Sequence, residues 1–372
     1  KADLGVHRSE GRLRALFAYF YCMANVCNRR TKFGTWDMIK GIWATLLSCL
    51  LIVGATASAE TYVSTQRIST QVSGVEVPIR VFYPTATQAQ NTRFGPWELN
   101  IAKNAEPIVG SYPLVIISHG LGGNDWNHHL LASRLVEAGF VVAALRHPDD
   151  FLRVGEPEHS VLRPLELRSA VDQVLGSEPF STLIDRNRIG AFGFSAGGYT
   201  VLAVAGGLPD RNRIVEHCAI AQNDPEFCIG EEGGERLPLW LRAKRAFYSM
   251  PKVDTEQELQ DTRIKALVVA APVGLLFHDL SRITQPTLLI RAGNDQTLRY
   301  PYHAQNVHAL LPQEHEYMVI ENLHHYAFLS PFPDTIASEV GEPAQDPEGF
   351  ERQEFLVVMN DKITAFFSKN LK

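Results

Sequence analysis

Short apolar runs alternate with helix-forming segments along most of this sequence, and this alternation constrains the fold more than any other feature. The apolar runs are 114–118, 140–145, 188–194, 264–271, 287–291 and 316–320. The helical patterns between and after them are 126–138, 165–175, 196–205, 303–311 and 350–367. Strands that are almost wholly apolar and alternate with helices are typical of a mostly parallel sheet covered on both faces. We therefore predict an α/β fold.

Two further segments complete the predicted architecture. Residues 62–83 alternate and end at Pro84, which indicates two antiparallel strands entering the fold. Residues 85–112 are polar and rich in turn formers, so we expect a loop there. The stretch 207–263 interrupts the alternation and is predicted to be an insertion folded over one end of the sheet.

Charge is unevenly distributed along the 372 residues, whose formal net charge is −6. Residues 1–59 carry +5, which leaves −11 for residues 60–372. An acidic body argues against nucleic acid or an anionic membrane as the main partner. The length of residues 60–372 is compatible with one α/β domain.

Residues 38–59 have the composition of an export signal. A basic start at Met38–Lys40 precedes a short apolar stretch, and Ala57-Ser58-Ala59 resembles a cleavage site. The alternatives are a buried helix or a membrane anchor, but the apolar stretch is shorter than the roughly 20 residues that cross a bilayer. We expect residues 1–37 to be an upstream extension outside the fold. The mature chain, 60–372, is then periplasmic or secreted, with no stable membrane span.

Cysteine usage agrees with an oxidising compartment. Of five cysteines, only Cys218 and Cys228 fall in the expected mature chain, and we predict that they form a disulfide. A metal site is disfavoured because no second Cys or His pair lies at zinc spacing. Neighbouring histidines such as His128-His129 do not share one face of a helix, so they do not suggest a metal pair either.

The pattern G-x-S-x-G occurs at Gly193–Gly197, between an apolar strand and an apolar helix. In that context the serine, Ser195, sits on a sharp turn that exposes its hydroxyl at the carboxyl edge of the sheet. The flanking glycines remove side chains that would clash there. The alternative, a plain strand–helix turn, is disfavoured by this context, so Ser195 is the predicted nucleophile.

A serine nucleophile needs a base and an acid that orients the base, and in this fold class they follow in the order Ser, Asp/Glu, His. Asp295 directly follows the strand 287–291, and His325 follows the strand 316–320. Both positions lie where parallel sheets gather catalytic groups. We predict Asp295 and His325 as the partners of Ser195. Three alternatives remain for these roles: His324, Asp279 and Asp224.

Two backbone N–H groups are predicted to stabilise the oxyanion that forms during acyl transfer. One belongs to Ala196, the residue after the nucleophile, and the other to the loop after strand 114–118, where we select Leu121. A phosphate-binding loop is disfavoured because neither G-x-x-x-x-G-K-[ST] nor G-x-G-x-x-G occurs at 119–123. No cofactor and no metal is implied.

These motifs resemble those of exported bacterial predicted dienelactone hydrolases, a group similar to platelet-activating-factor acetylhydrolases and more distantly to cutinase-like polyester hydrolases. The likeness covers about residues 62–330 and rests on Ser118–Gly123, Gly139–Pro148, Gly193–Gly198, Asp295 and His325. It implies an α/β-hydrolase fold with a triad of Ser195, Asp295 and His325. True dienelactone hydrolases use a cysteine nucleophile, and cutinase-like enzymes usually have Met where this chain has Ala196, so neither substrate is carried over.

The sequence thus predicts a serine hydrolase that cleaves carboxylic esters of small-molecule or lipid-like substrates. A lipase, phospholipid acyl hydrolase, thioesterase or peptidase on the same triad is one alternative. A non-catalytic hydrolase-fold binding protein is another, although such scaffolds usually lack a triad member. The aromatic and apolar residues of the insertion either wall an acyl pocket or form its own core: Trp240, Phe247, Tyr248 and Met250.

Overall fold

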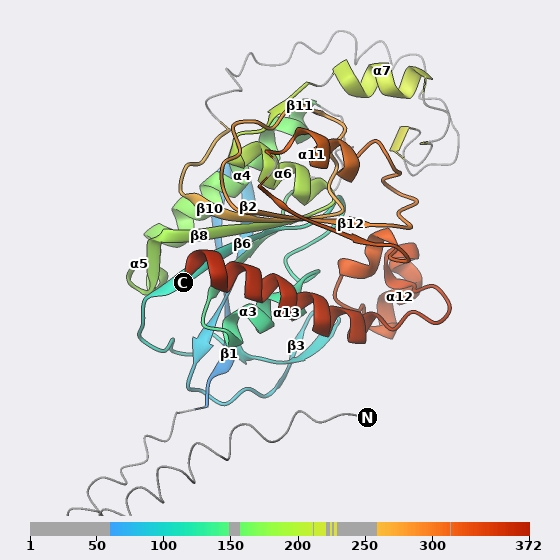
Figure 1. The fold of residues 1–372 in the computed structure, drawn as a ribbon. Helices are drawn as coiled ribbons and strands as arrows, with labels where there is room; N and C mark the ends of the chain where they lie inside the picture. The colour runs from blue at the N-terminus through green and yellow to red at the C-terminus, as the bar shows by residue number, and fades with distance from the viewer. Residues whose placement is uncertain are drawn as a thin grey trace, which may run out of the picture. The chain divides into compact units, whose positions relative to one another are not determined.

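A twisted sheet runs through the unit formed by residues 60–372 (Figure 1). The structure, a computed structural model, describes residues 60–148, 157–210, 212–220, 224, 227–228, 259–312 and 314–372. Within these ranges the sheet has nine strands in the order β13-β12-β10-β8-β6-β7-β2-β1-β5. They are β1 (Tyr62–Val72), β2 (Val75–Thr85), β5 (Ala102–Lys103), β6 (Tyr112–Ser118), β7 (Val141–Leu145), β8 (Ile184–Phe194), β10 (Ile264–Ala270), β12 (Thr287–Ala292) and β13 (Glu316–Ile320).

Pairing within the sheet is mostly parallel. Strands β13, β12, β10, β8, β6 and β7 run parallel to one another, whereas β2 pairs antiparallel with both β7 and β1. This confirms the predicted parallel sheet and the predicted antiparallel pair at its start. The carboxyl ends of β8, β12 and β13 therefore lie along one edge, where the segments carrying Ser195, Asp295 and His325 begin.

Helices cover both faces of the sheet, as Figure 1 shows. Helices α3 (His129–Glu137) and α13 (Arg352–Leu371) pack on one face, and α4 (Pro157–Gly176) and α6 (Ala196–Ala205) pack on the other. Alternate residues of β6 enter opposite layers: Val115 belongs to the core under α3 and α13, and Ile116 belongs to the core under α4 and α6. Burial on both faces explains why the covered parts of the central strands are almost wholly apolar.

The remaining helices are short or lie at the periphery. They are α5 (Phe180–Leu183), α7 (Asn212–Ile220), α11 (Ala304–Leu310), η1 (His325–Phe328), α12 (Asp334–Val340) and η2 (Glu342–Ala344). The predicted helix at 165–175 is longer than expected, because α4 begins at Pro157 and passes through Pro164. Proline disfavours a helix interior, which is why the prediction began after it.

The prediction of a loop over 85–112 is wrong in part. A hairpin of β3 (Asn91–Phe94) and β4 (Trp97–Asn100) forms there, turning at Gly95 with a φ of 61°. Phe94 and Trp97 are buried, and their rings pack against Trp126 in the loop before α3. These contacts between distant parts of the chain stabilise a hairpin whose own sequence is largely polar.

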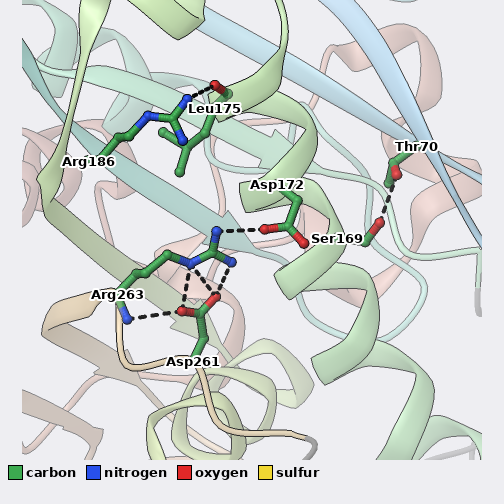
Figure 2. A network of polar contacts seen from close by, with 7 residues as sticks. All are labelled: Thr70, Ser169, Asp172, Leu175, Arg186, Asp261 and Arg263. Carbon is green, nitrogen blue, oxygen red and sulfur yellow. Dashed lines mark hydrogen bonds and ion pairs between the residues drawn. The ribbon is translucent and has the colours of Figure 1, made fainter.

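A polar network ties α4 to its neighbours at the edge of the sheet away from the carboxyl strand ends (Figure 2). Arg263 donates to Asp172 on α4 at 2.6 Å and to Asp261 at 2.6 Å. The hydroxyl of Ser169 on α4 lies 2.7 Å from the hydroxyl of Thr70 on β1. These contacts join α4 to β1 and to the segment that leads into β10.

Only the flanks of the predicted insertion belong to the described residues. Strand β9 (Leu208–Pro209) pairs with β11 (Phe277–Asp279), α7 follows, and a disulfide joins Cys218 to Cys228 as predicted. Trp240, Phe247, Tyr248 and Met250 lie outside the described residues, as do the predicted export signal and the segment before it.

Residues Glu60–Lys372 form one compact unit. In the described part of the chain, no helix combines the length and hydrophobicity needed to cross a membrane.

Candidate active site

Ser195 occupies a sharp turn between β8 and α6. Its backbone has a φ of 55° and a ψ of −117°, a conformation that residues with a side chain rarely adopt. Four backbone hydrogen bonds hold the turn. The Ser195 N–H donates to the Ala270 carbonyl at 3.0 Å, and the Ser195 carbonyl accepts from the N–H groups of Gly198 at 2.9 Å, Val273 at 3.0 Å and Tyr199 at 3.3 Å. The surrounding structure thus enforces a strained conformation, as is common at catalytic positions.

The two outer glycines of the motif are required by close backbone contacts. A Cβ at Gly197 would lie 1.9 Å from the Ser118 carbonyl oxygen, and a Cβ at Gly193 would lie 2.2 Å from the Gly197 carbonyl oxygen. Both distances are far inside van der Waals contact. The G-x-S-x-G pattern is therefore a packing requirement of this turn.

The three side chains selected from the sequence meet at the carboxyl edge of the sheet. The Ser195 hydroxyl lies 3.0 Å from His325 Nε2, and His325 Nδ1 lies 2.7 Å from Asp295 Oδ2. Because a carboxylate oxygen only accepts, Nδ1–H donates to Asp295 and leaves Nε2 free to accept the serine proton. All three residues are buried, with Ser195 the most exposed at 9 %. The arrangement fits a serine–histidine–aspartate triad.

The loop after β12 holds the Asp295 carboxylate in place. Its Oδ1 accepts the N–H groups of Thr297 at 3.0 Å and Leu298 at 2.7 Å. The other oxygen, Oδ2, is directed at His325. The ring of His325 also packs on Phe194, with 4.9 Å between ring centroids. Asp295 and His325 are thus fixed by contacts that the sequence pattern alone did not reveal.

The rival residues are held elsewhere. His324 faces Asp346 at 3.3 Å and Phe350, and Asp279 accepts the Ser281 N–H at 2.7 Å. Asp224 is buried and bound to His217 at 2.8 Å and to His303 at 3.2 Å. The position next to Ser195 is therefore occupied by His325 and Asp295.

Asp224 and its histidines form a second buried polar cluster. Burial opposes ionisation of Asp224, but hydrogen bonds and charge interactions with His303 and His217 outweigh it, so the Asp224 pKa lies below its ordinary value. Burial lowers the pKa of His303 despite the neighbouring carboxylate. His217, Asp224 and Cys228 lie close enough to share a metal ion. However, the Cys228 sulfur is bonded to Cys218, so it does not offer a thiolate.

The loop after β6 passes directly beside Ser195. A Cβ at Gly120 would lie 3.1 Å from the Phe194 ring and 3.3 Å from the Ser195 Cβ. Leu121 follows at the surface, 37 % exposed, and Ala196 is the first residue of α6. Ala196 is therefore next to Ser195 in the sequence, and Leu121 follows a residue that lies beside Ser195 in space. The role of both N–H groups as oxyanion donors stays a prediction.

Sequence reasoning missed a group of buried polar residues beneath this loop: Ser118, His119, His147, Arg163 and Glu166. A partial signal was available, because Ser118 and His147 end or follow adjacent parallel strands and should therefore be neighbours. Arg163 and Glu166 come from α4, and their contribution depends on how that helix packs.

A cavity of about 200 Å³ reaches Asp295. Its lining includes Asp295, Arg291, Arg299 and Tyr300, and the Arg291 guanidinium lies 5.0 Å from the centre of the Tyr300 ring. Neither Ser195 nor His325 is among the described residues that line it. This cavity is therefore not assigned as the acyl site.

The mostly parallel sheet, the helices on both faces and the serine turn after β8 define an α/β-hydrolase fold. Comparison with known protein families agrees with this class. Residues 71–154 match the model of platelet-activating factor acetylhydrolase, isoform II, which bears out part of the resemblance seen in the motifs. The matched segment runs from the end of β1 past β7 and includes the Gly120–Leu121 loop. It implies a hydrolase of ester bonds, and it ends before Ser195.

Proposed function

We propose that this protein is a carboxylic ester hydrolase that works through Ser195, His325 and Asp295 and an acyl-enzyme intermediate. The observation that carries the proposal is the pair of contacts from His325, 3.0 Å to the Ser195 hydroxyl and 2.7 Å to Asp295. The family match supports the ester bond as the target.

In the acylation step, the Ser195 oxygen attacks the ester carbonyl carbon while His325 Nε2 takes the hydroxyl proton. Asp295 keeps the imidazole in the Nδ1–H form and stabilises its cation. The carbonyl electron pair moves to oxygen, and the Leu121 and Ala196 N–H groups stabilise that charge. Collapse of the intermediate expels the alcohol, which receives the proton from His325.

Deacylation repeats these steps with water as the nucleophile. His325 takes a proton from the water, the water oxygen bonds to the acyl carbon, and the Ser195 oxygen leaves with the proton returned by His325. The products are a carboxylic acid and the free enzyme. No step calls for a group beyond these side chains, the two N–H donors and water.

The name of the matched family supports a preference for short acyl groups, since it specifies hydrolysis of an acetyl group from platelet-activating factor. Lipase, phospholipid acyl hydrolase and thioesterase activities use the same chemistry and differ in the shape of the acyl site. A disulfide between Cys218 and Cys228 supports a periplasmic or secreted location, because such bonds persist in oxidising compartments.

Steady-state hydrolysis of p-nitrophenyl esters from acetate to laurate, together with an acyl thioester, tests the proposal. We expect the purified protein to turn over at least the short esters and Ser195→Ala to lose this activity. The chain length with the largest kcat/KM then separates esterase from lipase. A wild-type protein that cleaves none of these substrates would favour the non-catalytic alternative.

A further inference from the structure

Five polar residues lie buried beneath the loop that carries Leu121. They are Ser118, His119, His147, Arg163 and Glu166, and the most exposed of them, Glu166, has 4 % of its surface accessible. They come from the end of β6, the segments after β6 and β7, and helix α4. Burying charged groups is costly unless they are paired and hydrogen-bonded. A function of this cluster should therefore explain why these polar groups are kept buried despite their desolvation.

Ser118, His147 and Glu166 form a chain of hydrogen bonds. The Ser118 hydroxyl lies 2.8 Å from His147 Nε2, and His147 Nδ1 donates to Glu166 Oε2 at 2.6 Å. The order serine–histidine–carboxylate repeats that of the triad, but Ser118 and His147 have 0 % exposed surface. Because fully buried side chains are out of reach of a substrate, this series of hydrogen bonds serves to fix the position of His147.

The backbone of His147 determines the tautomer of His119. The His147 N–H donates to His119 Nε2 at 3.0 Å, and because a backbone N–H is only a donor, Nε2 must be the unprotonated ring nitrogen. The proton of the neutral ring is then on Nδ1, which donates to the Gly120 carbonyl at 2.5 Å. The Gly123 N–H donates to the same oxygen at 3.2 Å.

Arg163 holds the preceding peptide group. Its guanidinium donates to the His119 carbonyl oxygen. The carbonyls of two successive residues, His119 and Gly120, are therefore both anchored from below the loop.

Fixing the Gly120 carbonyl also fixes the Leu121 N–H. The two groups belong to one planar trans peptide, in which C=O and N–H point in opposite directions. With the oxygen held by His119 and Gly123 on one side, the N–H is directed to the other. A Cβ at Gly120 would lie only 3.3 Å from the Ser195 Cβ, so this peptide lies next to the Ser195 turn.

We propose that His119, His147, Glu166 and Arg163 are positioning residues that orient the Leu121 N–H as an oxyanion donor. The proposal rests on the function proposed above. Their contribution is realised when charge develops on the substrate oxygen, so it affects the transition state more than substrate binding.

The test compares His119→Phe and the pair Glu166→Ala and Glu166→Gln with the wild type. His119→Phe keeps a ring but removes the Nδ1–H donor, and Glu166→Gln keeps an oxygen that accepts from His147, whereas Glu166→Ala does not. Asp261→Asn is the matched control, because Asp261 is a buried carboxylate paired with Arg263 at the far edge of the sheet (Figure 2).

Each variant is assayed for kcat and KM on a p-nitrophenyl ester and for inhibition by a trifluoromethyl ketone. The ketone adds the Ser195 oxygen at its carbonyl carbon and so presents an oxyanion to the loop. Removing an oxyanion donor costs roughly 10²–10³-fold in kcat, so misdirecting one should cost about 10–100-fold. We expect such a loss in His119→Phe, with KM changed less than about twofold and the inhibition constant raised in parallel with the fall in kcat/KM.

A smaller loss is expected in Glu166→Ala, with recovery in Glu166→Gln and wild-type kcat in Asp261→Asn. The proposal is overturned by folded His119→Phe and Glu166→Ala variants that keep wild-type kcat and inhibition, or by an equal loss in Asp261→Asn, which would indicate a structural effect. If His119→Phe does not fold, the two Glu166 variants decide alone. Failure of the proposed function looks different, because the wild type itself would then neither cleave the ester nor bind the ketone.

Discussion

Replacing Ser195 by glycine should yield a more stable protein than replacing it by alanine. Both substitutions remove the hydroxyl, so they differ only in the presence of a Cβ. In this structure the residue has a φ of 55° and a ψ of −117°, where a Cβ is strained and glycine is not. The stability difference between the two variants therefore measures the strain in the turn.

The expected difference follows from two opposing contributions. A residue with a side chain held in such a sparsely populated conformation is strained by roughly 1–3 kcal/mol. Relief of this strain stabilises the glycine variant, but glycine also loses more conformational entropy on folding than alanine does, which destabilises it by about 0.5–1 kcal/mol. Taking the middle of each range, the free energy of unfolding of Ser195→Gly should exceed that of Ser195→Ala by about 1 kcal/mol.

Urea unfolding of both variants, followed by tryptophan fluorescence, measures the difference. Ser169 in α4 offers a matched control, because its hydroxyl also makes one hydrogen bond but its backbone is helical. There the order should reverse, with Ser169→Gly less stable than Ser169→Ala by about 1 kcal/mol. Equal stabilities at position 195, or a less stable glycine variant, would show that the serine turn is not strained.

Three further predictions test separate parts of the structure. His325→Ala should lower kcat/KM by roughly 10⁴-fold or more. The ring of His324 faces Asp346 instead, so His324→Ala should keep kcat/KM within about tenfold of the wild type. Equal losses in the two variants would contradict the assignment of His325 as the base. Serine at both Cys218 and Cys228 should lower the free energy of unfolding by about 2–3 kcal/mol, because the bond closes a loop with a sequence separation of 10; an unchanged urea midpoint would contradict this. Burial lowers the pKa of His128 from 6.5 to about 4. The folded protein therefore keeps its full stability above pH 6.5, where the ring is neutral in both the folded and the unfolded state. As the pH falls from 6.5 toward 4, the free energy of unfolding should decrease by up to about 3 kcal/mol. His128→Gln should make the free energy of unfolding depend less on pH across that window. An unchanged pH dependence in the variant would refute the lowered pKa of His128.

The sequence predicted the sheet well because its central strands are buried on both faces. Such strands are almost wholly apolar, as in Val141–Leu145, which is buried at every position and is followed by the polar Arg146. The hairpin of β3 and β4 escaped prediction because Phe94 and Trp97 are stabilised by Trp126, which lies far along the chain. Local composition there is that of a loop.

The site residues that follow strands of the parallel sheet could be predicted from the order of the strands. The residues whose position depends on how a helix packs on the sheet could not. Ser195, Asp295 and His325 each follow a strand of the parallel sheet, so topology brings them to one edge. Glu166 has no such marker, because its contact with His147 depends on the rotation of α4 over the sheet. The choice of His325 over His324 likewise depends on the geometry of one turn.

Mapping the adduct formed with a fluorophosphonate probe tests the central claim most directly. The probe modifies an activated serine, so peptide mass spectrometry should locate one adduct on Ser195. Labelling should be lost in Ser195→Ala and strongly slowed in His325→Ala. An unlabelled wild-type protein, or an adduct on a serine other than Ser195, would contradict the proposed chemistry.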